Sequence, residues 1–135
     1  MRRLSSASFM LAALAAAFPA MAAHKSALPQ PPKPSVVKGD PVRGQQLYQS
    51  CMGCHSIDDN DIGPMHRGVV GHRAGTVPGY AYSAALRGSG IVWTPANLDR
   101  WLTNPQKMVP GSKMFFSVAA PRDRTDIIAW LATQK

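Results

Sequence analysis

The chain has 135 residues, a formal net charge of +8 at pH 7 and a hydrophobic fraction of 45%. This length fits one domain, and the hydrophobic fraction is enough for a packed core, so the chain is not disordered as a whole. The absence of any run of about 20 apolar residues excludes an ordinary multi-span membrane protein. Two cysteines are too few for a disulfide-rich scaffold.

Residues 1–22 have the layout of a secretory signal peptide. Arg2 and Arg3 form a basic N-terminal region, and residues 9–18 are apolar. Ala20 and Ala22 are small residues at the two positions that a signal peptidase recognises before its cleavage site. We therefore expect cleavage after Ala22 and a periplasmic protein, in an oxidising compartment. An uncleaved N-terminal segment anchored in the inner membrane is the alternative.

Residues 23–39 contain several prolines and lysines and few bulky apolar residues. This composition is typical of an extended linker or a disordered N-terminus. The segment is either a spacer that holds the domain off a membrane or a partner, or a tail left by processing. The folded domain is expected to cover residues 40–135.

The first helix is expected to begin at Asp40-Pro41, with aspartate at the N-cap and proline at the first helical position. An approximate helical stripe of apolar residues follows, made of Val42, Leu47, Tyr48 and Cys51. Residues 56–81 are rich in glycine and proline, which predicts turns and loops. Residues 83–87 can form one or two further helical turns.

The second half of the chain repeats these signals. Thr94-Pro95 predicts another helix start, and Asn104-Pro105 predicts its end. A loop is expected over residues 108–117, followed by a last helix that begins near Pro121. That helix should pack its apolar residues, which are Ile127, Ile128, Trp130 and Leu131. The pattern predicts an all-α domain of three main helices, with short helices and long loops.

The sequence CMGCH at residues 51–55 is a C-x-x-C-H motif, the attachment signal for c-type haem. Two thiols on one helical turn reach two vinyl groups on one edge of a porphyrin, and His55 then lies under the ring as an iron ligand. We therefore expect one haem c, attached covalently through Cys51 and Cys54. The alternatives are a thioredoxin-like redox pair, whose βαβ context is absent, and a half zinc site, which needs a further ligand.

Further segments accompany this motif in a familiar order. They are GQQLY at 44–48, GP at 63–64, GHRAG at 71–75, PGYAYS at 78–83, GIVWT at 90–94, NP at 104–105, PGSKM at 110–114 and DIIAWL at 126–131. With these segments, residues 44–135 resemble the class I c-type cytochromes, in their mitochondrial-type and bacterial soluble branch. The resemblance implies the cytochrome c fold, with its helices and long loops wrapped around one haem.

The second iron ligand must come from downstream of His55. The residues alone offer five candidates, which are Met65, His66, His72, Met108 and Met114. Met65 and Met108 are expected to be packing residues. His66 and His72 are expected to be exposed loop residues.

Met114 follows Pro110-Gly111 in a loop that can fold back over the far face of the ring, and the resemblance implies the same residue. Ligation by His55 and Met114 would leave no open coordination position. That arrangement favours electron transfer over substrate chemistry.

Three more residues are expected around the haem. The carbonyl of Pro64 can accept from the free ring nitrogen of His55, which is how the family uses this proline. Tyr82 and Trp93 resemble the family's buried donors to a haem propionate. The alternative for both aromatic residues is plain core packing.

Gly44 and Tyr48 are four residues apart and therefore share one helix face. We expect Gly44 to let the last helix approach closely and Tyr48 to pack near Trp130. Their role would be structural.

Some positions around Met114 differ from the family pattern. Trp101 replaces a tyrosine that usually donates to the methionine sulfur, and whether the indole N–H reaches is open. Gln106 stands at a position that is often basic. Lys107 and Lys113 flank the loop and would steer the protein onto acidic faces of redox partners, the alternative being a merely solvated positive surface.

The resemblance implies an electron-transfer protein and not an enzyme. We expect a monomeric periplasmic carrier in a respiratory chain, with membrane complexes such as a quinol–cytochrome c reductase and a terminal oxidase as partners. Nucleic acid is not expected as a partner. The alternatives are the cytochrome c subunit of a dedicated oxidoreductase, an open-site haem peroxidase and a gas sensor.

Overall fold

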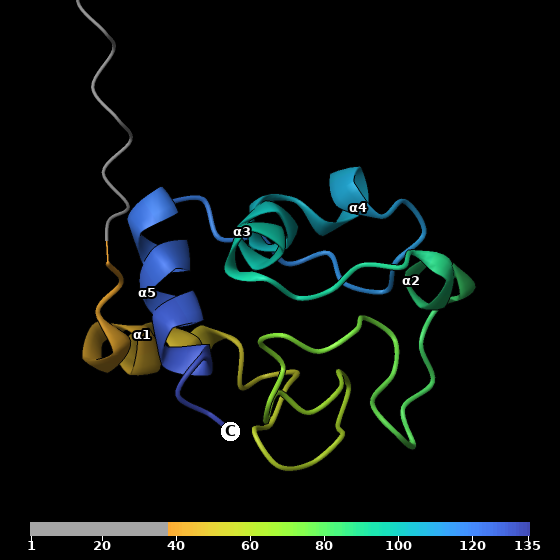
Figure 1. The fold of residues 1–135 in the computed structure, drawn as a ribbon, viewed down its shortest axis with the longest axis horizontal. Coiled ribbons are helices and arrows are strands. Elements are labelled where there is room, and N and C mark those ends of the chain that lie inside the picture. The colour runs from red at the N-terminus through yellow and green to blue at the C-terminus, as the bar shows by residue number, and fades with distance from the viewer. Residues whose placement is uncertain (1–37) are drawn as a thin grey trace, which may run out of the picture. The chain divides into compact units, whose positions relative to one another are not determined.

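A computed structural model describes residues 38–135. The predicted signal peptide and all but the last two residues of the predicted linker lie outside the described residues. The elements in chain order are α1 (Pro41–Leu47), the 3-10 helix η1 (Tyr48–Ser50), α2 (Ala84–Gly88), α3 (Pro95–Thr103), α4 (Pro105–Met108) and α5 (Pro121–Leu131) (Figure 1). None of residues 38–135 belongs to a strand, and Arg73 and Val92 form one isolated β-bridge.

The all-α prediction is therefore confirmed, with α1, α3 and α5 as the main helices. They gather on one side, where α5 packs against both α1 and α3, while long loops run between η1 and α2 and between α4 and α5 (Figure 1). No helix of residues 38–135 has the length and apolar character needed to cross a membrane.

Side-chain caps begin the helices where the sequence predicts them. The Asp40 carboxylate accepts from the backbone N–H of Val42 at 2.9 Å, and Pro41 takes the first helical position. Thr94 caps α3 in the same way, and Ser83 caps α2. These bonds satisfy backbone donors that have no partner inside the helix.

Two expectations about the helices need correction. Asn104-Pro105 ends α3 as predicted, but it also begins α4. The side-chain oxygen Oδ1 of Asn104 accepts from the backbone N–H of Lys107 at 2.9 Å and so caps this second helix. Val42 does not belong to the buried stripe of α1, since it is 69% exposed. Successive helical residues turn by 100°, so Val42 points away from the face shared by Gly44 and Tyr48.

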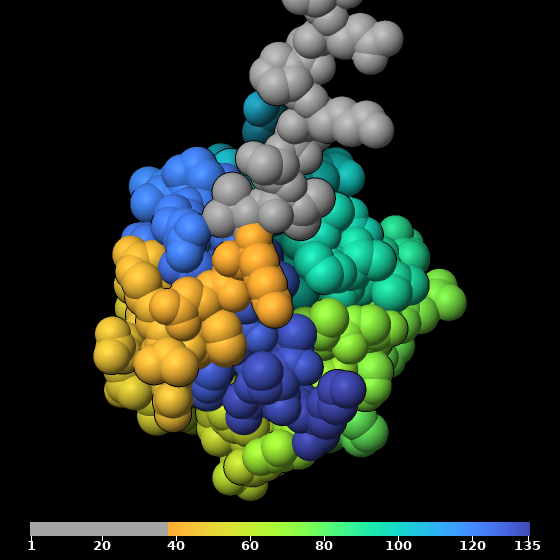
Figure 2. All heavy atoms as spheres, turned by 60° about the vertical axis from the view of Figure 1, so that its left-hand side comes forward, coloured from red at the N-terminus to blue at the C-terminus, as the bar shows by residue number. Residues whose placement is uncertain are grey.

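The face of α1 that carries Gly44 lies directly on α5, so the segments near the two ends of the described chain are side by side (Figure 2). A Cβ atom at Gly44 would stand 2.0 Å from the carbonyl oxygen of Asp126 and 2.9 Å from Cβ of Trp130. The Tyr48 and Trp130 rings lie 4.3 Å apart between centroids. The predicted close approach of these helices is confirmed, and no residue larger than glycine fits at the crossing.

Asp126 adds a buried charge beside this crossing. Its carboxylate is fully buried and accepts from the backbone N–H of Asp40 at 2.8 Å, from Arg43 at 2.5 Å and from Arg122 at 3.1 Å. Burial by itself would raise the pKa of Asp126, but the three donors more than offset it, and the pKa lies below its ordinary value. The second nitrogen of Arg43 also binds Asp123, so one guanidinium joins α1 to α5 twice.

We expect Asp126→Asn to flatten the acid limb of the stability curve. Because the folded-state pKa of Asp126 is lowered from 3.8, its contribution is present above that pH and is lost as the pH falls through 3.8 toward the folded-state value. The free energy of unfolding, measured by denaturant titration at several pH values, should fall less steeply below pH 4 in the variant. Asp59→Asn, at an exposed position, is the control. Parallel acid limbs for wild type and Asp126→Asn would contradict this role.

Candidate haem-binding site

The two cysteines and the histidine of the C-x-x-C-H motif share one tight turn at the end of η1. The backbone N–H groups of Cys54 and His55 both donate to the carbonyl of Cys51, at 3.1 and 2.9 Å. Both thiols are free; Cys51 is partly buried and Cys54 is exposed. The turn thus holds two unpaired thiols and one imidazole within five residues.

The ring of His55 is fixed from two directions. Its Nδ1 atom lies 2.8 Å from the carbonyl oxygen of Pro64. A carbonyl can only accept, so Nδ1 carries the proton and Nε2 keeps a free lone pair. Gly63 lies against the ring, where a Cβ atom would come within 2.2 Å of Cε1. Burial lowers the pKa of His55, so the neutral, ligating form is present at neutral pH.

His66, one of the five candidate ligands, lies in surroundings that the sequence interpretation did not predict. The prediction of an exposed loop histidine is wrong for His66, because its ring stacks on His55 with centroids 4.0 Å apart and an angle of 22° between the planes. Its Nδ1 atom lies 2.9 Å from the hydroxyl of Tyr48. Burial above all, and to a lesser extent the neighbouring His55, lowers the pKa of His66 to about 3, so the ring is neutral. No spacing rule links Tyr48 to His66, 18 residues away, so no sequence signal could have found this pair.

Met114 is partly buried and packs against the core, with its sulfur beside Trp101 of α3. The indole N–H of Trp101 donates to Sδ at 3.1 Å, which answers the question left open by the sequence. Trp101 is itself buried, and its ring lies 5.2 Å from that of Trp93. The thioether therefore has a fixed orientation before any ligand is considered.

The other candidate ligands occupy different surroundings. Met108 is partly buried and packs against the core. Met65 is partly buried, and its backbone N–H donates to the side chain of Asn60 at 3.1 Å. His72 is exposed. None of these three side chains has a contact that orients its sulfur or nitrogen as Trp101 orients Met114.

Tyr82 and Trp93 are both buried, at 9% and 8% exposure. Burial raises the pKa of the Tyr82 phenol, so its hydroxyl keeps its proton and can donate. The Tyr82 ring packs edge-on against Tyr80, whose own hydroxyl donates to the carbonyl of Ile62 at 2.6 Å. Their predicted role as propionate donors stays a prediction.

The donor set fits haem c. A pair of free thiols, an imidazole with Nε2 available and an oriented thioether match the two attachment points and two axial ligands of a c-type haem. Within residues 38–135, no group of three or more His, Cys, Asp or Glu side chains is arranged to hold a metal ion.

Comparison with known proteins identifies the family. The Cytochrome c family model matches residues 41–135, all but three of the residues that the structure describes. The chain belongs to the cytochrome c family. It carries covalent haem c, attached through Cys51 and Cys54, and it is an electron-transfer protein and not an enzyme.

Individual relatives agree with this assignment. The chain is 46% identical over 100 residues to cytochrome c2 of Rhodomicrobium vannielii, covering 71% of this chain and 80% of the relative. It is 48% identical over 101 residues to cytochrome c of Euglena viridis, covering 72% and 99%. Among solved structures, cytochrome cH from Methylobacterium extorquens is similar with a TM-score of 0.69 and 44% identity, covering 70% of this chain and 99% of that one.

The contact between Tyr48 and His66 can be tested with a double-mutant cycle. Tyr48→Phe and His66→Leu each leave one buried polar atom without a partner, so each should lower the free energy of unfolding by about 1–3 kcal/mol. The double variant should lose less than the sum by about 1 kcal/mol, since neither partner is then left unpaired. Denaturant titration of the four proteins gives the coupling. His72→Leu, at an exposed histidine, should change stability by less than about 0.5 kcal/mol. Strictly additive losses for the pair would rule out the coupling.

Proposed function

We propose that the protein is a periplasmic one-electron carrier whose haem iron is held by His55 and Met114. The observation that carries this proposal is the indole-to-sulfur hydrogen bond, 3.1 Å from Trp101 Nε1 to Met114 Sδ, because it orients a thioether that packs against the core. The imidazole of His55, oriented by Pro64, supplies the ligand from another part of the chain. The names of the relatives, cytochrome c2 and cytochrome c, support the carrier role.

The residues around the haem keep both ligands in place during turnover. Haem c supplies an iron that alternates between the ferrous and ferric states. Pro64 holds the proton on Nδ1 of His55, and Trp101 orients the sulfur of Met114. Tyr82 and Trp93 would donate to the propionates and hold these charges in a buried setting. With neither ligand leaving, little reorganisation accompanies electron transfer.

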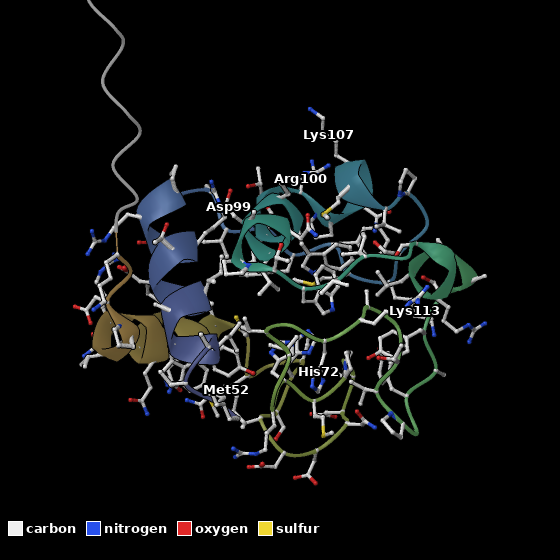
Figure 3. The ribbon with its side chains drawn as sticks, viewed as in Figure 1. Met52, His72, Asp99, Arg100, Lys107 and Lys113 are labelled. Carbon is white, nitrogen blue, oxygen red and sulfur yellow. The ribbon has the colours of Figure 1, made fainter. Side chains whose placement is uncertain are left out.

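The surface beside Met114 supports docking by a redox partner. Phe115 and Phe116 follow the ligand directly and are 77% and 48% exposed. Lys107 and Lys113 are exposed as well, with Lys107 on α4 and Lys113 near α2 (Figure 3). The ammonium of Lys113 donates to the carbonyl of Ala81 at 2.5 Å, so its charge has a fixed place. Exposed apolar rings with nearby positive charges suit an acidic partner face with an apolar centre.

We infer that these partners are membrane redox complexes of a respiratory chain, such as a quinol–cytochrome c reductase and a terminal oxidase. The signal-like start of the sequence supports export to the periplasm. A monomer is the expected form, since a carrier must leave one complex before it reaches the next.

The ferric absorption spectrum tests the ligand set. The holoprotein should show the weak far-red band of methionine sulfur on ferric haem. Met114→Ala should lose this band, and Met108→Leu, which changes a packing methionine, should keep it. A high-spin wild-type spectrum would overturn the closed site and favour the peroxidase or gas-sensor alternatives.

The hydrogen bond from Trp101 should raise the reduction potential. An N–H donor draws electron density from the sulfur, which weakens its support of ferric iron more than of ferrous iron. Trp101→Phe should therefore lower the potential, by about 20–60 mV if the bond favours the ferrous over the ferric form by on the order of 0.5–1.5 kcal/mol. Redox titration of the holoprotein measures the shift, with Val42→Ala, at an exposed position of α1, as the control. A potential that is unchanged or higher in Trp101→Phe would contradict the argument.

A further inference from the structure

The loop between α4 and α5 turns back sharply before it reaches Met114. Gly111 has a φ of +82°, in the left-handed region that glycine adopts without steric cost. The backbone N–H of Ser112 donates to the carbonyl of Val109 at 3.1 Å. This turn ends at Ser112, two residues before the ligand, so it does not by itself fix the main chain at Met114.

The side chain of Gln106, on α4, makes that attachment. Its Nε2 atom lies 2.8 Å from the carbonyl oxygen of Ser112, 2.9 Å from the Ser112 hydroxyl and 2.8 Å from the carbonyl oxygen of Met114. Its Oε1 atom accepts from the backbone N–H of Gly111 at 3.3 Å. One amide therefore ties three residues of the loop to α4, and the last of them is Met114 itself.

The partners also determine which way the amide points. The carbonyl oxygens of Ser112 and Met114 can only accept, and the backbone N–H of Gly111 can only donate. Rotating the amide by half a turn would place Oε1 against two carbonyl oxygens and the NH2 group against an N–H. A lysine at residue 106 could not accept from Gly111, and a glutamate could not donate to the carbonyls. Glutamine alone among residues of this size satisfies both sides.

The setting of Gln106 makes these bonds matter. The side chain is partly buried, and Ser112 is 4% exposed, so water has limited access to replace the broken contacts. Trp101 holds the sulfur of Met114, whereas Gln106 holds its main chain. Any movement of the loop that carries Met114 away from its place separates Met114 O and Ser112 O from Gln106.

We propose that Gln106 is a positioning residue that keeps Met114 on the haem iron by holding the ligand loop closed. This inference rests on the proposed ligation by Met114. Gln106, which is not itself a ligand, would then control how often the sixth coordination position opens. In the sequence analysis, Gln106 was notable only because related proteins often have a basic residue at this position.

Displacement of Met114 by imidazole in the ferric holoprotein tests the proposal. At saturating imidazole the observed rate is limited by loop opening, and the far-red band reports the loss of the sulfur ligand. Gln106→Met, which removes every hydrogen bond at similar size, should raise this limiting rate about tenfold or more. Gln106→Glu keeps the shape but turns the contacts with the carbonyl oxygens of Ser112 and Met114 into repulsions between oxygens, so its rate should rise at least as much. Gln106→Lys, which retains donors but no acceptor, should fall between wild type and Gln106→Met.

Two controls separate positioning from general stability. Gln46→Met makes the same chemical change at an exposed position of α1 and should leave the rate within about twofold of wild type. Denaturant midpoints measured by far-ultraviolet circular dichroism show whether each variant is folded; Gln106→Glu serves if Gln106→Met is not. A wild type without the far-red band overturns the ligation and this inference together. A wild type with the band, and rates for Gln106→Met and Gln106→Glu that match Gln46→Met, overturns this inference alone.

Discussion

The close approach of α1 and α5 at Gly44 positions the side chains that lead to His55, the proposed iron ligand. It brings Tyr48 onto Trp130, and the same tyrosine reaches His66 through its hydroxyl. His66 in turn stacks on His55, the proposed iron ligand. The orientation of an imidazole in a loop thus depends on a glycine eleven residues earlier that permits two helices to touch. Without that contact the C-x-x-C-H turn would have no rigid support on this side.

The two proposed ligands are held by different means. His55 is fixed by a carbonyl on one ring nitrogen, by the Gly63 backbone against the ring and by a stacked histidine. Met114 has an indole on its sulfur and an amide on its carbonyl oxygen. The imidazole is therefore held mainly by packing, whereas the thioether is held by directional hydrogen bonds. Electron transfer without ligand loss needs both, since the polypeptide on either side of the haem has little regular structure.

The parts of the fold governed by neighbouring residues could be predicted from the sequence. The caps at Asp40 and Thr94 and the turn that holds Cys51, Cys54 and His55 all follow from residues within a few positions of one another. The family resemblance added Met114, which spacing alone left among five candidates. The interactions missed by the sequence interpretation join distant segments: Tyr48 with His66, and Arg43 with Asp126. Gln106 was noticed only for the charge it lacks, because a propensity argument does not reveal where a side-chain amide points.

Gly63 is a position at which no larger residue can be accommodated. Its φ is not among the positive values found at six other glycines, so its backbone conformation does not by itself require glycine. What excludes a side chain there is the His55 ring, within 2.2 Å of where Cβ would stand. The constraint is one of space alone, and it exists because the imidazole must lie flat against the chain to meet Pro64. Backbone conformational preferences alone would not predict that a substitution at residue 63 is harmful. Such a substitution would nevertheless displace the imidazole ring of His55, the proposed iron ligand.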